Sequence, residues 1–229
     1  MLKKTALFLF VSLLTQQVLA QNQNNPLYDI SRKVHFGFAI GLNTSTMALK
    51  PSDASYTQNT FTKVNQATFP FISLQPVCNF HLRERLDLRL VLDFSLSQRN
   101  IDFTHITGFK ESKVIPSAYL GVPVLLKYKS VRHENWRFYV IGGFGYAYDF
   151  ESNEGHVQDI REPLVALKKH NYYYSYGAGF DIYNKLFKLS PELRVATGLN
   201  DVLVANPDAY TTMFDGARNT MVWLSFFFE

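Results

Sequence analysis

Apolar and polar residues alternate along residues 86–99, which read LDLRLVLDFSLSQR. Successive side chains of a β-strand point to opposite faces, so this stretch predicts a strand with one apolar and one polar face. The apolar face carries Leu86, Leu88, Leu90, Leu92, Phe94 and Leu96, and the opposite face is charged or polar except at Val91. The alternation lasts about fourteen residues, longer than the five or six of an ordinary strand and long enough for a transmembrane one.

Seven further stretches share this pattern of one apolar face and one small or polar face. In 171–184, for example, Tyr172, Tyr174 and Tyr176 lie on the face opposite Ser175 and Asp181. With the first stretch, the predicted strands are 34–43, 71–80, 86–99, 117–129, 136–150, 171–184, 188–200 and 219–229. Pro123 inside the fourth of these predicts a β-bulge, because proline cannot donate a ladder hydrogen bond.

The predicted connections are long and short in turn. The odd-numbered ones span about 17–27 residues and the even-numbered ones about 3–6. Outer-membrane barrels have long external loops and short periplasmic turns, whereas a soluble ligand-binding barrel would turn its apolar face inward. The sequence therefore predicts an all-β, eight-stranded, antiparallel up-and-down transmembrane β-barrel of the bacterial outer membrane.

The polar faces of these strands would place a set of charges in the lumen. An eight-stranded barrel is filled by side chains, and buried charges must be paired, so we interpret the set as ion pairs. A proton or ion path is the alternative, but no motif supports it. The predicted lumen residues are Asp87, Arg89, Asp93, Arg99, Lys127, Arg137, Asp149, Asp181, Glu192 and Arg194.

The two ends of the chain predict an exported membrane protein. Residues 1–20 have a basic start, an apolar run and a small-residue cleavage site, which is the pattern of a cleaved signal peptide. Residues 21–33 would form a periplasmic leader, and 34–229 the barrel that contacts outer-membrane lipid. The last strand ends in Phe226, Phe227 and Phe228, the aromatic kind of terminus that barrel-insertion machinery reads, followed by Glu229.

Composition and residue spacing argue against nucleic-acid binding, a zinc site and hydrolase catalysis. The net charge is +4, but the basic residues form no stripe that would bind nucleic acid. Cys78 is the single cysteine of the sequence, so it has no second cysteine for a disulfide or a zinc site. His170 and Ser175 are five residues apart, on opposite faces of one strand, which is wrong for a nucleophile and its base. We expect no enzyme activity, metal, cofactor or small-molecule substrate.

Several phrases resemble the PorT (SprT) family of outer-membrane barrels from the type IX secretion and gliding-motility system. They are HFGFAIGLN (35–43), GVPVLLKYKS (121–130), FYVIGGFGYAYDF (138–150), FKLSPELRVATGLNDVL (187–203) and LSFFFE (224–229). The similarity runs through most of the mature chain, in matching order. It implies a non-enzymatic barrel required for exporting proteins with C-terminal secretion signals, acting in assembly or maturation of the machinery beside other secretion components.

Partner contacts are expected at the periplasmic turn 129–137, which reads KSVRHENWR and suits an acidic surface. The candidate contact residues are Lys129, Arg132, His133 and Arg137. An alternative function is that of a generic small barrel that acts as an adhesin or envelope-structural protein through its long external loops.

Overall fold

A computed structural model describes residues 24, 28, 33–51, 61–105, 107, 109–152, 167–204 and 214–229. The predicted signal peptide and most of the predicted leader lie outside these residues. In the described part of the chain, no helix is long and apolar enough to cross a membrane.

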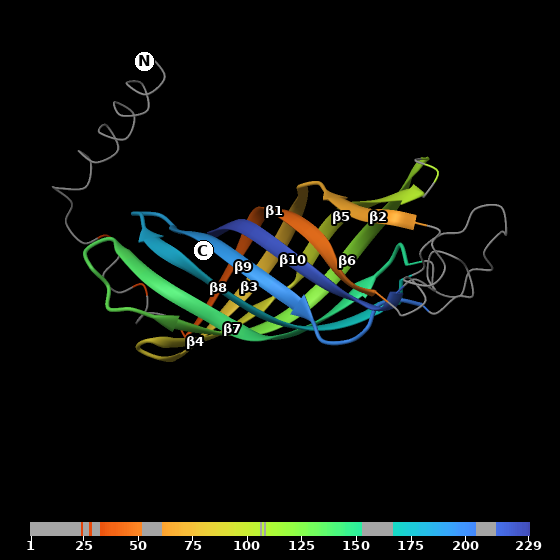
Figure 1. The fold of residues 1–229 in the computed structure, drawn as a ribbon. Helices are drawn as coiled ribbons and strands as arrows, with labels where there is room; N and C mark the ends of the chain where they lie inside the picture. Colours follow the sequence, from red (N-terminus) through yellow and green to blue (C-terminus); the bar gives the residue numbers. More distant parts are fainter. Residues whose placement is uncertain are drawn as a thin grey trace, which may run out of the picture.

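Ten strands form a single antiparallel sheet that closes on itself (Figure 1). They are β1 Val34–Pro51, β2 Phe61–Thr68, β3 Phe71–Arg83, β4 Leu86–Val91, β5 Asp93–His105, β6 Lys110–Lys129, β7 Trp136–Asp149, β8 His170–Tyr183, β9 Lys188–Gly198 and β10 Phe214–Phe228. Chain order and spatial order agree, because β2 and β3 together form one crossing and β4 and β5 together form the next. The ring thus has eight crossings, which confirms the predicted fold class.

Closure depends on β1, which pairs with β10 on one side and with β3 on the other. The β1–β10 ladder runs from Phe38 opposite Phe228 to Pro51 opposite Phe214, with one irregularity at Pro51. The β1–β3 ladder is shorter and ends at Asn43 opposite Phe71. The first and last crossings therefore meet, as an up-and-down barrel requires.

The ladder is interrupted at Leu92, between β4 and β5, without a change of register. Pro76 of β3 and Pro123 of β6 flank this point, and neither has an N–H to donate. The Leu92 N–H still donates to the Pro76 carbonyl at 2.9 Å. Because Leu90 faces Val124 and Asp93 faces Gly121 in one continuous register, the β-bulge predicted at Pro123 is wrong.

Several strands extend farther than predicted at one end of the barrel. This end, which we call the loop end, holds the connections after β1, β5, β7 and β9; the opposite end is the turn end. β5 continues to His105 and β6 begins at Lys110, paired with each other almost throughout. The connection 106–109 is therefore shorter than the turn 130–135, and the strict alternation of long and short connections is wrong here.

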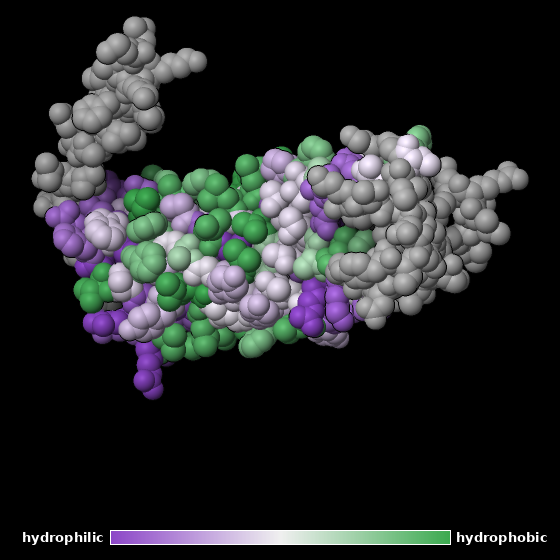
Figure 2. Space-filling model, in the orientation of Figure 1, coloured by the Kyte–Doolittle hydropathy of each residue, from purple (hydrophilic) through white to green (hydrophobic). Residues whose placement is uncertain are grey.

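Apolar side chains cover the outside of the barrel in a belt (Figure 2). Phe36 is 76% exposed, Ile72 65% and Phe144 68%, although each lies within a regular strand. A soluble monomer rarely exposes a contiguous apolar surface of this extent. The belt is suited to hydrocarbon rather than to water, as the sequence pattern predicts.

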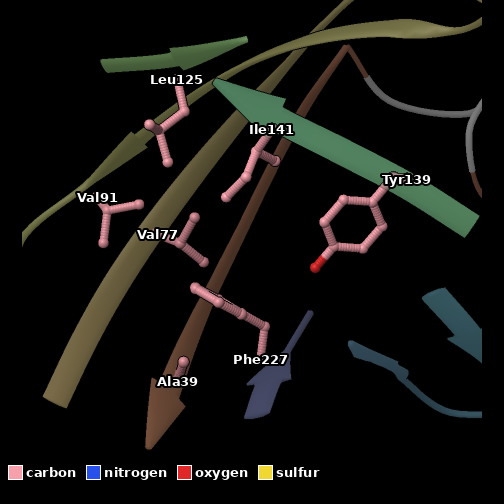
Figure 3. Packing of buried hydrophobic residues seen from close by; sticks show 7 residues of the cluster. All are labelled: Ala39, Val77, Val91, Leu125, Tyr139, Ile141 and Phe227. Carbon is pink, nitrogen blue, oxygen red and sulfur yellow. The ribbon is translucent and has the colours of Figure 1, made fainter. Parts of the chain in front are cut away.

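The inside of the barrel is a packed core. Near the turn end, Ala39, Val77, Val91, Leu125, Tyr139, Ile141 and Phe227 project from six strands toward one another (Figure 3). Glycines on the inner face make room for large rings on the neighbouring strand: Tyr139 lies over Gly179, and Tyr173 lies over Gly145. A Cβ at Gly145 would stand 2.4 Å from the Tyr173 ring, so a side chain there would force the ring to move.

A charge placed in the belt should destabilise the barrel far more than one placed beyond it. Val124 is the middle residue of the outward apolar row on β6, and Val124→Arg should cost about 2–4 kcal/mol. Thr46→Arg, at an outward position of β1 toward the loop end, should cost about 0–1 kcal/mol. Urea unfolding of both variants in phospholipid vesicles measures the two costs, and equal values would contradict the assignment of the belt.

Candidate functional site

The structure places all ten of the predicted lumen charges inside the barrel. Each residue is buried, with at most 8% of its surface exposed. They come from six successive strands, β4 to β9, so their side chains converge on the lumen from most of the ring. Two groups of contacts result, one near the turn end and one farther toward the loop end.

Arg89 is the centre of the group near the turn end. Its guanidinium donates to Glu192 at 2.5 Å and to Glu229 at 3.3 Å, and its Nε donates to Asn79 Oδ1 at 2.8 Å. The same guanidinium lies 4.6 Å from the centre of the Phe227 ring. A fully buried arginine is therefore held by two carboxylates, an amide and an aromatic face, which together replace its hydration.

Two lysines extend this group across the lumen. Lys127 Nζ lies 2.6 Å from Asp181 Oδ1, which also accepts from Ser190 Oγ at 2.7 Å. Lys188 Nζ lies 2.9 Å from Glu229 Oε2. Since Glu229 contacts both Lys188 and Arg89, charges from β4, β9 and the residue after β10 form one connected network.

Asp87 lies at the turn-end edge of this group. It lies 2.8 Å from Lys129 Nζ and 2.8 Å from His81 Nδ1. Lys129 is only 1% exposed, so its prediction as a surface contact is wrong. The reason is strand parity: Lys129 shares the inward face of β6 with Lys127.

A second group surrounds Arg194. Its Nη2 lies 2.6 Å from Asp93 Oδ2, and the guanidinium lies 4.5 Å from the centre of the Trp223 ring. Ser95 donates to Asp93 at 2.5 Å and accepts from the Trp223 indole N–H at 3.1 Å. Four side chains from three strands thus form a closed chain of contacts.

Arg99 and Asp149 lie beyond this group, toward the loop end. Arg99 donates to Ser117 Oγ and to Tyr119 Oη, both at 2.7 Å, and to Asn219 Oδ1 at 3.3 Å. Asp149 accepts from the backbone N–H groups of Ala118 and Glu151. Both charges are therefore held by hydrogen bonds to neutral groups.

Of the other candidate contact residues, Arg137 also lies inside and two lie at the turn-end surface. Arg137 is 8% exposed, and its guanidinium lies 5.9 Å from the Tyr183 ring centre. Arg132 lies 3.8 Å over the same ring and also donates to the carbonyl of Asn24, a residue of the predicted leader. His133 is exposed and stacks on Trp136, so Arg132 and His133 remain on the surface.

Sequence reasoning missed four members of the network: His81, Lys129, Lys188 and Glu229. The signal for two of them was present, because Lys188 shares the parity of Glu192 and Arg194, and Glu229 shares that of Phe227. The side chain of Glu229 is fully buried, which shows that the inward face continues one position beyond β10.

The arrangement is suited to filling the lumen, and it does not bring His170 and Ser175 together. His170 lies on the outside, 2.6 Å from Tyr146 Oη, while Ser175 is buried inside, as their odd spacing requires. In the part of the chain that the structure describes, no three His, Cys, Asp or Glu residues group as metal ligands would.

The chain belongs to the outer membrane protein beta-barrel domain family, whose model matches residues 19–204. It is thus an outer-membrane β-barrel protein of bacteria. No curated protein matches the chain.

Several solved structures have a similar fold at low sequence identity. OprG from Pseudomonas aeruginosa is 13% identical with a TM-score of 0.47, and the match covers 85% of this chain and 92% of OprG. AlkL is 12% identical with a TM-score of 0.46, covering 91% of this chain and 97% of AlkL. Ail from Yersinia pestis is 12% identical with a TM-score of 0.39, covering 86% of this chain and 99% of Ail.

Breaking one ion pair of the lumen should cost more than removing it entirely. Asp181→Asn leaves Lys127 as a buried charge without its carboxylate and should lower the free energy of unfolding by about 3–5 kcal/mol. The double variant Lys127→Met/Asp181→Leu should lose less stability than Asp181→Asn, because neither charge of the pair is then left buried without its partner.

The control is the surface pair Lys50–Asp215, whose side chains are 77% and 50% exposed. Asp215→Asn should change stability by less than about 1 kcal/mol. Equilibrium unfolding in vesicles compares all four proteins. A double variant less stable than Asp181→Asn would contradict the reading of the pair as charge compensation.

Proposed function

We propose that this barrel is a non-catalytic component of the type IX secretion and gliding-motility system. In this role it is required for export of proteins with C-terminal secretion signals. The support is the resemblance to the PorT (SprT) family in five phrases spread from 35 to 229. We place its action in assembly or maturation of the machinery, together with other secretion components.

The observation that favours an accessory role over that of a conduit is the filled lumen. Arg89, Lys127 and Glu192 are all fully or almost fully buried, and each is held by a partner from another strand. An eight-stranded ring encloses only enough space for side chains, so a folded cargo has no room to pass. A protein of this kind acts through its surfaces, which favours an accessory role over that of conduit.

The turn end is the surface that we assign to secretion partners. Arg132 and His133 lie there beside the exposed Leu186, which is 94% exposed at the tip of the neighbouring turn. A cationic and apolar surface of this kind suits a partner with acidic and apolar side chains. Outer-membrane lipid around the belt and the barrel-insertion machinery complete the expected partners.

The alternative function, an adhesin or envelope-structural barrel, is favoured by a different observation. At the loop end, β2, β5 and β6 extend together away from β1 (Figure 1). A projecting sheet of this kind offers a surface to the exterior. This function predicts that loss of the protein changes adhesion or envelope integrity while export stays normal.

Deletion of the gene should leave proteins with C-terminal secretion signals in the periplasm. A census of proteins in the medium and in the periplasm, before and after complementation with the intact gene, measures this directly. Normal export together with altered adhesion would contradict the secretion role and favour the alternative.

A charge reversal at the turn end should reduce export while the barrel still folds. Arg132→Glu/His133→Glu would repel an acidic partner, and we expect export to fall toward the level of the deletion strain. The matched control is Lys50→Glu/Arg218→Glu, two exposed cations at the loop end, which should leave export unchanged. The shift of unboiled protein on a denaturing gel verifies folding of both variants; equal export from both would place the contact elsewhere.

A further inference from the structure

The wall of the barrel is not continuous at the loop end. The β1–β3 ladder stops at Asn43 opposite Phe71, and beyond it residues 44–51 of β1 pair only with β10. The next crossing continues as β2, whose residues 61–68 pair only with β5. Among the described residues, no strand pairs with the edges that β1 and β2 turn toward each other. We call these two facing edges, 44–51 and 61–68, the seam.

A side chain spans the seam where a backbone ladder would be expected. The Met47 N–H donates to Gln66 Oε1 at 3.0 Å, and Gln66 Nε2 donates to the Met47 carbonyl at 2.6 Å. The primary amide of Gln66 therefore offers Met47 one acceptor and one donor, the same pair that a residue of an antiparallel neighbouring strand offers. Gln66 mimics a peptide group at this edge.

The lower end of the seam is closed in a similar way. Asn43 Nδ2 donates to the carbonyl of Leu96 in β5 at 2.9 Å, passing the point at which β3 gives way to β2. Pro70 lies at that point, between the two strands, and cannot donate a ladder hydrogen bond. The Gln66 amide thus replaces backbone pairing within the seam, and the Asn43 amide links β1 to β5 just below it.

The two sides of the seam differ in character. Inside it lies an apolar cluster that contains Met47 and Ile101 and is completed by Leu167, Val202, Leu203 and Ala217. Outside it, Thr46, Lys50 and Asn65 are exposed, so this part of the wall lies beyond the apolar belt and in water. A strand laid along the seam would have an apolar side toward the cluster and a polar side toward solvent.

We propose that the seam binds an extended polypeptide segment by strand addition. The edge of β1 that β10 does not use carries a backbone donor and acceptor on every second residue, and a strand added along it replaces the Gln66 amide at Met47 with its own backbone. Alternating apolar and polar residues, without proline, are the chemistry that fits. A lipid chain does not fit, because it has no groups to pair with the edges and the outward residues are polar.

Gln66 acts as a displaceable substitute for the partner. Its amide must leave Met47 before a peptide backbone can take its place, so the intact protein binds more weakly than one that lacks the side chain. Peptide binding at the seam is independent of the secretion role.

The test uses the full-length protein in detergent micelles and a fluorescein-labelled peptide of about eight residues, with valine and threonine alternating between terminal lysines. Fluorescence anisotropy should show saturable binding to the native protein. Gln66→Ala should bind about tenfold more tightly, since the peptide no longer competes with the amide. Gln66→Asn, with a side chain too short to span the seam, should change the affinity in the same direction.

Two controls make the result specific. Gln98→Ala changes a glutamine of β5 that bonds Asn100 rather than the seam, and it should bind as the native protein does. A peptide methylated on every amide nitrogen keeps every side chain but has no backbone N–H to donate along the strand, and it should not bind. Equal binding of both peptides, an unchanged affinity in Gln66→Ala, or no binding by variants that still show the heat-dependent gel shift would each overturn the proposal.

Discussion

Buried charge is the constraint on which the rest of this barrel depends. Every second side chain of a strand points inward, and the interior of an eight-stranded ring is filled by these side chains. An inward charge must therefore be solvated by other side chains instead of by water. Arg89 illustrates the consequence: it is fully buried, and its partners Glu192 and Glu229 come from β9 and from the residue after β10. The network thereby ties the middle of the chain to its last strand, beside the place where β10 meets β1.

The same constraint limits what the protein can do. A lumen occupied by paired charges, by the Trp223–Arg194 contact and by two apolar clusters is a core rather than a passage. Function must then reside on the outside and at the ends. At the turn end, Arg132 and His133 lie at the surface, and Arg132 packs over the Tyr183 ring. At the loop end, the upper part of β1 has no ladder to β2.

Much of the fold and of the lumen could be predicted because alternation is a local property. Leu88 and Arg89 are assigned to opposite faces by their positions alone, and the structure places them so. The same alternation, applied to the first residue of the strand 188–200 and the last residue of the strand 219–229, places Lys188 and Glu229 in the lumen as well. Lys129 is both the last residue of the predicted strand 117–129 and the first of the predicted contact turn 129–137, and only its inward position at the end of β6 shows that it belongs to the lumen.

The sequence by itself determined the number of crossings, their antiparallel order and the face of each residue, because each follows from periodicity over ten or so residues. Only the tertiary structure decided which charges meet. Arg89 contacts Glu192, and Lys127 contacts Asp181. These pairs depend on how the ring closes and how the strands are staggered, and neither can be read from a local sequence pattern. The tertiary structure also decided that the pairing of β1 with the second crossing ends at Asn43, while β2 continues to pair with β5 beyond that point.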